Sequence, residues 1–434
     1  VTALAAMLGQ MGKPGSGVAY GYTITNYLGN NVFKMPYAPL PQGKNSITDF
    51  IPVARVSDML LNPGQKFDYD GREYTYPDID MIYWAGGNPF HHHQDLARLR
   101  KAWEKPSTVI VNEWCWNALA RHADIILPCT TTLERQDIGM TPRDPYVISM
   151  DKAIEPVGEA RNDYDIFAGI ARRMGTKDSF TEGRSAEEWQ KWIWEQSCER
   201  AEKLNVHMPD YESFREAGFY KSPDLKEDRI FLSDFFEDPD KNPLGTPSGK
   251  IEIFSETIDS FNYEDCPGHP TWMEPTEWLG AKNKAYPLHL ISNQPKTKLH
   301  SQMDNGTLSS SIKIKGHQPL ELNPDDAKSR GITQGDIVRV FNGRGSCLCG
   351  VNITTDVMPG VVIISTGSWY DPAEPNDPKS MCKHGNPNVL SPDIGTSKLG
   401  QGPAAHSCLA EIEIYDGPTQ DITAFNPPEI IEKK

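Results

Sequence analysis

The sequence has no run of about 20 apolar residues, so a membrane-crossing helix is not expected. It also lacks an excess of positive charge, because 43 Lys and Arg stand against 59 Asp and Glu, a formal net charge of -16 at pH 7. Nucleic-acid backbones are bound by clustered Lys and Arg, so DNA and RNA are not expected partners. Hydrophobic content of 38% and charged content of 24% are ordinary for a soluble protein.

The eight cysteines lack the spacing of a metal site. They form no CxxC pair and no zinc-type ligand set, and they stand at positions 115, 129, 198, 266, 347, 349, 382 and 408. A cysteine-held iron–sulfur cluster is therefore not expected. Cys347 and Cys349 alternate with Leu348 in a predicted strand, so both point to one face, where packing explains them. Disulfides are neither indicated nor excluded.

The first residues do not resemble the beginning of a protein. Residues 1–9 read as part of an amphipathic helix, with no initiator Met and without the charged region and cleavage site of a secretory signal. We therefore expect the chain to be the C-terminal part of a longer protein. Its 434 residues exceed one typical core, so two or three domains are expected.

The most informative segment is 81–95, MIYWAGGNPFHHHQD, in which an apolar strand runs into a Gly-Gly-Asn-Pro turn and then a helix. Two further strands are expected at 107–111 and 123–127, separated by helical stretches at 96–104 and 117–122. This β-α-β-α-β order predicts a doubly wound parallel sheet, whose ligands bind beyond the carboxyl ends of the strands. We assign this α/β domain to residues 1–160, including an irregular stretch from Gly12 to Gln65.

Polar residues follow each of the three predicted strands. They are Gly86, Gly87 and Asn88 after the first, Asn112 and Glu113 after the second, and Thr130 to Thr132, Glu134 and Arg135 after the third. Glycines allow the backbone to approach a ligand, and a helix N-terminus attracts phosphate. Taken singly, these residues are explained as well by surface charge, with Arg135 as the partner of Glu134. Taken together at consecutive strand ends, they favour a nucleotide-like ligand.

A second α/β region, with a linker, is expected over residues 161–283. Its first helix carries an apolar face from Ile166 to Met174 and ends at Gly175, and its next helix opens with the capping-box pair Ser185 and Glu188. Trp189 and Trp192 on that second helix are predicted to lie in a core. From Pro209 to Asn283 the Pro, Asp and Gly content suggests connecting loops.

The C-terminal region, 284–434, is predicted to be a β-barrel. Short strands are expected at 288–291, 337–341, 348–353, 361–365 and 409–414. A hairpin turn at 342–345 joins two of them, and one short helix at 324–330 is capped by Asn323 and ended by Gly331. Polar clusters occur at 292–294, 300–302, 386–391 and 398–401. Such residues suit a neutral heterocycle, although structural turns use them equally.

Seven ordered motifs carry a family resemblance. They are GGNPFHHHQD, ARHADIILPCTTTLERQDIG, GEARNDYDIF, HLISNQPKTKLHSQ, NPDDAKSRGI, GSWYDP and NVLSPDIGTSKLGQG. The chain resembles the dimethyl sulfoxide reductase family of bis-molybdopterin-guanine-dinucleotide enzymes, in particular its dimethyl sulfoxide, trimethylamine N-oxide and biotin sulfoxide reductases. The resemblance implies a six-stranded, double-psi-like C-terminal barrel. It also implies two pterin dinucleotides that share one molybdenum, one on the α/β domain and one on the barrel.

The resemblance assigns cofactor-binding residues to both domains. On the α/β side these are Gly86, Gly87, Asn88, His92, Gln94, Asn112, Glu113, Arg135 and Asp163, and Asp163 is expected to bind the guanine edge. On the barrel side they are Ser292, Asn293, Gln294, His300, Ser301, Asn388 and Gln401. The molybdenum-ligating serine and the substrate pocket of the family lie in an N-terminal portion that this chain does not include, so no catalytic residue is assigned.

The resemblance further implies reduction of S-oxides or N-oxides by oxygen-atom transfer. The expected partners are the oxide substrate, the N-terminal portion of the same enzyme and an electron donor such as a c-type cytochrome. The expected compartment is the periplasm, with the cytoplasm as the alternative. Two other functions stay open, a related molybdenum or tungsten enzyme with another substrate and a non-catalytic nucleotide-binding subunit.

Overall fold

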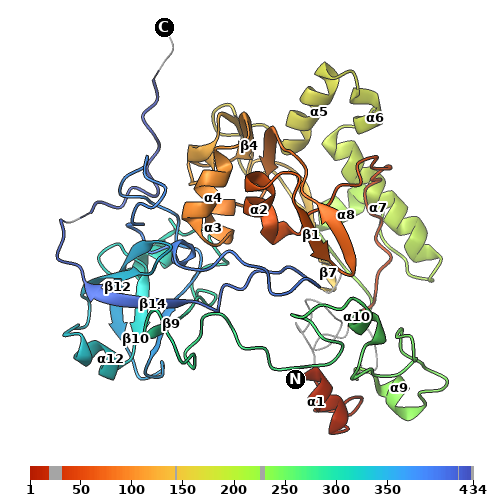
Figure 1. Ribbon diagram of the computed structural model, residues 1–434. Helices are drawn as coiled ribbons and strands as arrows, with labels where there is room; N and C mark the ends of the chain where they lie inside the picture. Colours follow the sequence, from red (N-terminus) through yellow and green to blue (C-terminus); the bar gives the residue numbers. More distant parts are fainter. Residues whose placement is uncertain (19–31, 142–143, 225–229, 419, 432–434) are drawn as a thin grey trace. The chain divides into compact units, whose positions relative to one another are not determined.

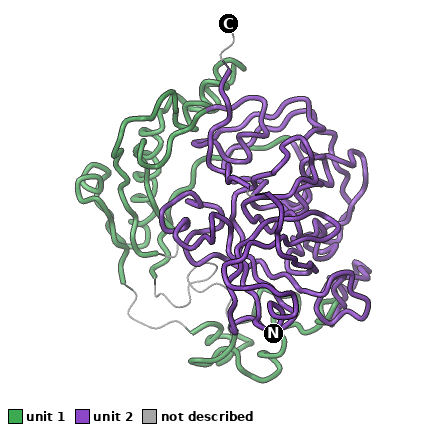
Figure 2. Tube along the Cα trace, turned by 90° about the vertical axis from the view of Figure 1, so that its left-hand side faces the viewer, with its two compact units in different colours: residues 1–46, 128–256, 268–270 green, residues 47–127, 257–267, 271–434 purple. Residues whose placement is uncertain are grey.

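The computed structural model describes residues 1–18, 32–141, 144–224, 230–418 and 420–431. The chain divides into two compact units, coloured separately in Figure 2. Unit 1 comprises residues 1–46, 128–256 and 268–270, and unit 2 comprises residues 47–127, 257–267 and 271–434. Contacts within each unit define this division, and the three-domain assignment made from the sequence stays a prediction. No helix among the described residues is long and apolar enough to cross a membrane.

Unit 2 contains the predicted α/β motif. Strand β3 (Met81–Ala85) pairs in parallel with β4 (Thr108–Glu113), and β5 (Ile125–Pro128), of which only Pro128 falls in unit 1, is the third strand of this sheet. Helices α3 (Pro89–His92) and α4 (Leu96–Trp103) follow β3, as predicted. The prediction of a helix over 117–122 is wrong in length, since only the 3-10 turn η2 (Ala120–His122) forms there.

The stretch predicted as irregular contains a helix. The 3-10 turn η1 (Val53–Arg55) leads into α2 (Val56–Leu61), which packs on α4, and the hairpin β1 (Lys66–Tyr69) and β2 (Arg72–Thr75) follows. Asp70 and Gly71 form the hairpin turn, and both have positive φ angles, 46° and 74°. Such a turn suits the twist of the paired strands.

The second part of unit 2 is the predicted closed barrel, in which Figure 1 labels the strands β9, β10, β12 and β14. Its strands pair in the order β10-β12-β11-β14-β9-β13, with parallel and antiparallel pairs mixed. Their bounds are β9 Leu288–Ile291, β10 Pro319–Leu322, β11 Ile337–Phe341, β12 Ser346–Ile353, β13 Val361–Ile364 and β14 Leu409–Ile414. Alternate residues of β9, β10 and β11 point inward and are fully buried, including Leu290, Leu320 and Val340.

Three short elements complete the barrel part. They are α11 (Thr307–Ser311), α12 (Pro324–Ser329) and the 3-10 turn η3 (Pro387–Val389). Asn323 caps α12, as predicted, by accepting a hydrogen bond from the Asp325 amide at 2.9 Å. Cys347 and Cys349 on β12 are both fully buried, with sulfur atoms 4.0 Å apart.

The α/β part and the barrel part of unit 2 are joined by ion pairs around the buried side chain of Asp393. Asp393, from the segment after η3, bonds Arg55 at 3.0 Å and Arg98 at 2.7 Å. Asp58 on α2 bonds the same two guanidinium groups. These four paired side chains therefore fix the segment after η3 against α2 and α4.

Unit 1 contains a three-stranded antiparallel sheet with helices around it. The strands are β6 (Asp137–Met140), β7 (Tyr146–Met150) and β8 (Phe219–Lys221). The helices are α1 (Thr2–Met7), α5 (Asp163–Arg173), α6 (Lys177–Thr181), α7 (Ala186–Glu202), α8 (Tyr211–Ala217) and α9 (Ser233–Glu237). Helix α10 (Glu256–Ser260) has its first residue in unit 1 and the others in unit 2. The capping box of Ser185 and Glu188 forms as predicted.

The core of unit 1 corrects one prediction. Residues from Pro209 onward were expected to be loops, but α8 places Phe214, fully buried, against the Trp194 ring at 3.7 Å. Trp189 is buried as predicted, whereas Trp192 is only half-buried. The Pro and Asp content of this region therefore marks the ends of a short helix as well as turns.

Candidate functional site

The turn after β3 has the conformation of a ligand-binding loop. Gly86 and Gly87 have φ angles of 80° and 72°, and a Cβ at Gly86 would meet only open space. Asn88 then caps α3, because its Oδ1 accepts a hydrogen bond from the Phe90 amide at 3.0 Å. Its Nδ2 atom is buried and has no hydrogen-bond partner among the described residues. A buried donor in this position requires an acceptor that a ligand could supply.

The two histidines of α3, His91 and His92, have different surroundings. His91 is buried, and its Nε2 atom, like Asn88 Nδ2, has no partner among the described residues. Burial, and then the neighbouring His92, lower the pKa of His91 to about 3. His92 is exposed, and its ring lies 6.1 Å from that of His300. Burial and His300 lower the pKa of His92 as well, so this turn offers neutral imidazoles at physiological pH.

Asn112 and Glu113 lie at the carboxyl end of β4, as predicted, and both are buried. Asn112 Oδ1 accepts a hydrogen bond from the Tyr83 hydroxyl at 2.8 Å, and Glu113 Oε1 accepts one from the Trp114 amide at 3.0 Å. Gln94 is also buried and donates from Nε2 to the His92 carbonyl at 3.0 Å. Each of these side chains is therefore oriented by a contact inside unit 2.

The barrel contributes the loop after β9, which carries Ser292 to Ser301. Gln294 Nε2 lies 3.0 Å from His300 Nδ1, and Asn293 Oδ1 accepts a hydrogen bond from the Ser365 hydroxyl at 2.7 Å. Ser292, half-buried, directly follows the strand. The predicted barrel ligands Ser292, Asn293, Gln294, His300 and Ser301 thus share one loop.

Asn388 in η3 binds the α/β part directly. Its Nδ2 donates to the His91 carbonyl at 3.0 Å, and the neighbouring Asn386 donates from Nδ2 to the Phe90 carbonyl at 3.1 Å. Because His92 also approaches His300, the structure brings residues predicted for the two dinucleotides together around α3. Gln401 takes a different position, since its Nε2 donates to the Asp68 carbonyl in β1 at 2.9 Å.

Two predicted residues lie in unit 1. Arg135 donates from Nη1 to the Thr130 carbonyl at 2.9 Å and pairs with Asp137 at 3.2 Å. It does not pair with Glu134, whose carboxylate accepts hydrogen bonds from the amides of Thr131 and Val157 instead. Asp163 occupies the first turn of α5 and is half-buried.

The donors and acceptors of unit 2 fit a neutral heterocycle with polar edges. Around α3 they are amides, neutral imidazoles and backbone groups, and two buried side-chain nitrogens lack partners among the described residues. Within that described part, no group of three His, Cys, Asp or Glu side chains could hold a metal ion alone. His91 was not predicted, because the HHH sequence does not show which of three consecutive histidines is buried.

Two protein-family models match the chain. Residues 1–173 match "Molybdopterin oxidoreductase", and residues 288–409 match "Molydopterin dinucleotide binding domain". The chain therefore belongs to the molybdopterin oxidoreductases, and its cofactor is of the molybdopterin type with molybdenum.

Among curated relatives, the chain is similar to oxide reductases. It is 45% identical to a dimethyl sulfoxide/trimethylamine N-oxide reductase of Cereibacter sphaeroides, over 98% of this chain and 53% of that protein. It is 46% identical to a biotin sulfoxide reductase of the same organism, over 96% and 56%. It is 40% identical to a trimethylamine-N-oxide reductase of Haemophilus influenzae, over 98% and 54%. The chain thus spans about half the length of the curated relatives it matches.

The fold is also similar to that of solved structures. Acetylene hydratase from Pelobacter acetylenicus superimposes with a TM-score of 0.59 at 20% identity, over 78% of this chain and 45% of that one. At this identity the likeness concerns the fold alone. It agrees with the predicted combination of a parallel sheet and a closed six-stranded barrel.

Proposed function

We propose that this chain binds the two guanine dinucleotides of a bis-molybdopterin cofactor in an enzyme that reduces S-oxides or N-oxides. The observation that carries the proposal is a pair of buried nitrogens, Asn88 Nδ2 and His91 Nε2, that have no partner among the described residues. They belong to a turn that barrel residues reach, because Asn388 binds the His91 carbonyl and the His300 ring approaches that of His92. The similarity to sulfoxide and N-oxide reductases supports the substrate class.

The proposed ligands act by hydrogen bonding. Gly86 and Gly87 leave room for a phosphate near the N-terminus of α3, and Asn88 would donate its free amide hydrogen to the cofactor. Gln94, Asn112 and Glu113 would complete this dinucleotide site in unit 2, and Arg135, in unit 1, is proposed separately as a ligand of the cofactor. The second would be formed by Ser292, Asn293, Gln294, His300, Ser301, Asn388 and Gln401.

Asp163 has a distinct proposed role, recognition of guanine. A carboxylate can accept from both the ring N–H and the amino group of guanine. Each charge-assisted hydrogen bond of this kind contributes about 1.5 to 3 kcal/mol. No other common base offers two adjacent donors in this arrangement, so Asp163 would select the guanine form of the cofactor.

When bound, the molybdenum cofactor supplies the oxygen-atom and electron transfer. The residues of this chain hold and orient it. The low pKa of His91 and of His92 keeps both imidazoles neutral, so that they hydrogen-bond without adding positive charge. We assign no catalytic residue in this chain. The proposed compartment is the periplasm, with a c-type cytochrome as electron donor, and the alternative is the cytoplasm.

The replacement Asp163→Asn tests the guanine assignment. An amide in place of the carboxylate loses one acceptor and the negative charge, so guanine retention should fall roughly tenfold or more. The measurement is GMP released by acid hydrolysis per molybdenum in purified protein. Asp165→Asn is the matched control, because Asp165 lies in the same first turn of α5 and is exposed. Equal GMP content in both variants and the unchanged protein would contradict the assignment.

Metal analysis separates the oxide-reductase proposal from the non-catalytic alternative. The purified protein, with the complete gene product expressed, should contain molybdenum and reduce dimethyl sulfoxide or trimethylamine N-oxide. Tungsten with no oxide reduction would favour a related enzyme of other specificity. Absence of both metals would favour a nucleotide-binding subunit.

A further inference from the structure

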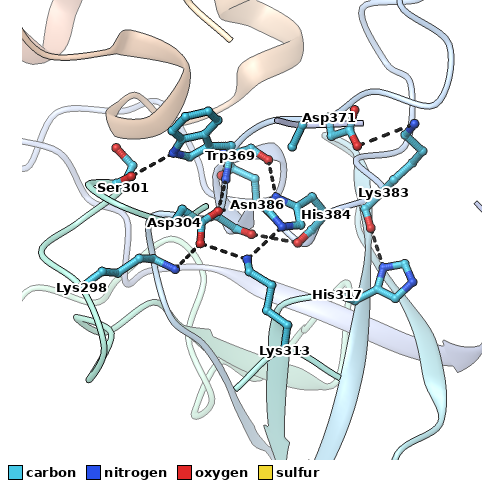
Figure 3. Close-up of polar contacts among 12 residues, drawn as sticks. Lys298, Ser301, Asp304, Lys313, His317, Trp369, Asp371, Lys383, His384 and Asn386 are labelled. Carbon is cyan, nitrogen blue, oxygen red and sulfur yellow. Dashed lines mark hydrogen bonds and ion pairs between the residues drawn. The ribbon is translucent and has the colours of Figure 1, made fainter. Parts of the chain in front are cut away.

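A cluster of buried charges lies close to Ser301, which belongs to the loop after β9 (Figure 3). Asp304 is fully buried, and its Oδ1 accepts hydrogen bonds from Lys298 Nζ at 2.6 Å and Lys313 Nζ at 2.9 Å. Both ammonium groups are also buried, with 0% and 5% of their side chains exposed. Burial of three charges costs free energy that is offset only where their ion pairs and hydrogen bonds have good geometry. The arrangement therefore requires an explanation.

His384 completes the cluster as a neutral group. Its Nε2 lies 2.8 Å from Lys313 Nζ, which can only donate, so Nε2 accepts and Nδ1 carries the proton. Nδ1 then donates to the Trp369 carbonyl at 3.1 Å. Burial and the neighbouring Lys313 lower the pKa of His384 to about 3. The 3.7 Å approach of His384 to Asp304 is therefore not an ion pair.

The cluster holds Trp369 from both sides. Asp304 Oδ2 accepts a hydrogen bond from the Trp369 amide at 3.1 Å, while His384 binds the carbonyl of the same residue. The indole Nε1 of Trp369 in turn donates to the Ser301 carbonyl at 2.8 Å. Asp304 is thus connected through one tryptophan to the backbone of the predicted cofactor loop.

The backbone of this loop is strained. His300 and Met303 have positive φ angles, 48° and 56°, which residues other than glycine adopt only when their surroundings enforce it. Gly367 packs so closely that a Cβ at this position would overlap the His300 carbonyl. The surroundings that enforce the turn are therefore Asp304, Trp369 and Gly367.

We propose that Asp304 and Trp369 are positioning residues that hold the His300–Ser301 turn in the conformation that binds the pterin dinucleotide. The proposal rests on the proposed function of this loop. The two lysines keep Asp304 ionised, and His384 fixes the second side of Trp369. Without this support the strained turn would relax, and His300 would lose its orientation toward Gln294 and His92.

The replacement Trp369→Phe tests the proposal, because it removes the indole donor and retains an aromatic ring. Trp194→Phe is the matched control. Trp194 is also buried, and its Nε1 donates to the Pro209 carbonyl at 2.9 Å in unit 1. Both variants should lose similar thermal stability. Only Trp369→Phe should release the cofactor faster, by roughly tenfold, as measured by pterin fluorescence in the filtrate of the cofactor-loaded full-length protein.

A second pair of variants distinguishes an effect on the His300–Ser301 turn from general misfolding. Gly367→Ala should displace the His300 carbonyl, whereas Gly335→Ala adds a Cβ at a similar φ of 83° into open space. Faster cofactor release with Gly367→Ala and not with Gly335→Ala supports the proposal. Equal release from all four variants and the unchanged protein would overturn it. If the unchanged protein holds no pterin, the proposed function fails instead.

Discussion

The buried ion pairs of Asp393 allow a quantitative prediction. The Asp393 side chain is 2% exposed and accepts hydrogen bonds from Arg55 at 3.0 Å and Arg98 at 2.7 Å. In the replacement Asp393→Asn the shape is retained, but two guanidinium groups then share only Asp58. Breaking a buried pair in this way costs about 3 to 5 kcal/mol. We expect about 3 kcal/mol, the lower end, because the asparagine oxygen can still accept one hydrogen bond.

The matched control is Glu413→Gln on β14. Glu413 pairs with Arg339 at 2.9 Å, a similar distance, but these side chains are 52% and 40% exposed. An exposed pair contributes about 0 to 1 kcal/mol. Urea unfolding followed by circular dichroism measures the free energy of unfolding of both variants. If Asp393→Asn costs no more than Glu413→Gln, burial does not determine the strength of these pairs.

Three further predictions concern stability. Burial lowers the pKa of His91, His122 and His384 from 6.5 to about 3, 4 and 3, respectively. As the pH falls below 6.5, these histidines therefore take up protons in the unfolded chain while they stay neutral in the folded protein. The free energy of unfolding should therefore decrease as the pH is lowered from 6 to 4.5, by roughly 1.4 kcal/mol per pH unit for each histidine. Urea titrations at several pH values measure this slope, and a His122→Gln variant that keeps the full slope would contradict the prediction. Phe214→Ala should cost about 3 to 5 kcal/mol in the same assay, since the ring is fully buried, and a cost under about 1 kcal/mol would exclude this packing. Asn323→Ala should cost about 1 to 2 kcal/mol through the lost helix cap, and no change in the urea midpoint would show that the cap is dispensable.

Local signals in the sequence predicted much of the fold. The strand and turn at 81–88 form as expected, because an apolar run followed by two glycines and Asn-Pro has few alternatives. The barrel was also predicted, but β10 was missed. This strand is only four residues long and starts with Pro319, which argues against a strand because proline cannot donate a hydrogen bond to a neighbouring strand.

The candidate site was less predictable. The sequence shows polar residues at strand ends, yet it does not show which of three adjacent histidines is buried or that Gln401 bonds the β1 backbone. Nor does it connect Asp304 with Trp369, which are distant in sequence and meet only after the barrel closes. Such contacts depend on tertiary packing, which local patterns do not encode.

We propose that this chain belongs to an enzyme that carries a molybdenum cofactor with two guanine dinucleotides. Molybdenum and GMP should be measured together in one sample of purified full-length protein. Two GMP for each molybdenum are expected under this proposal. A different nucleotide, a GMP content near zero, or the absence of molybdenum from intact folded protein would contradict it.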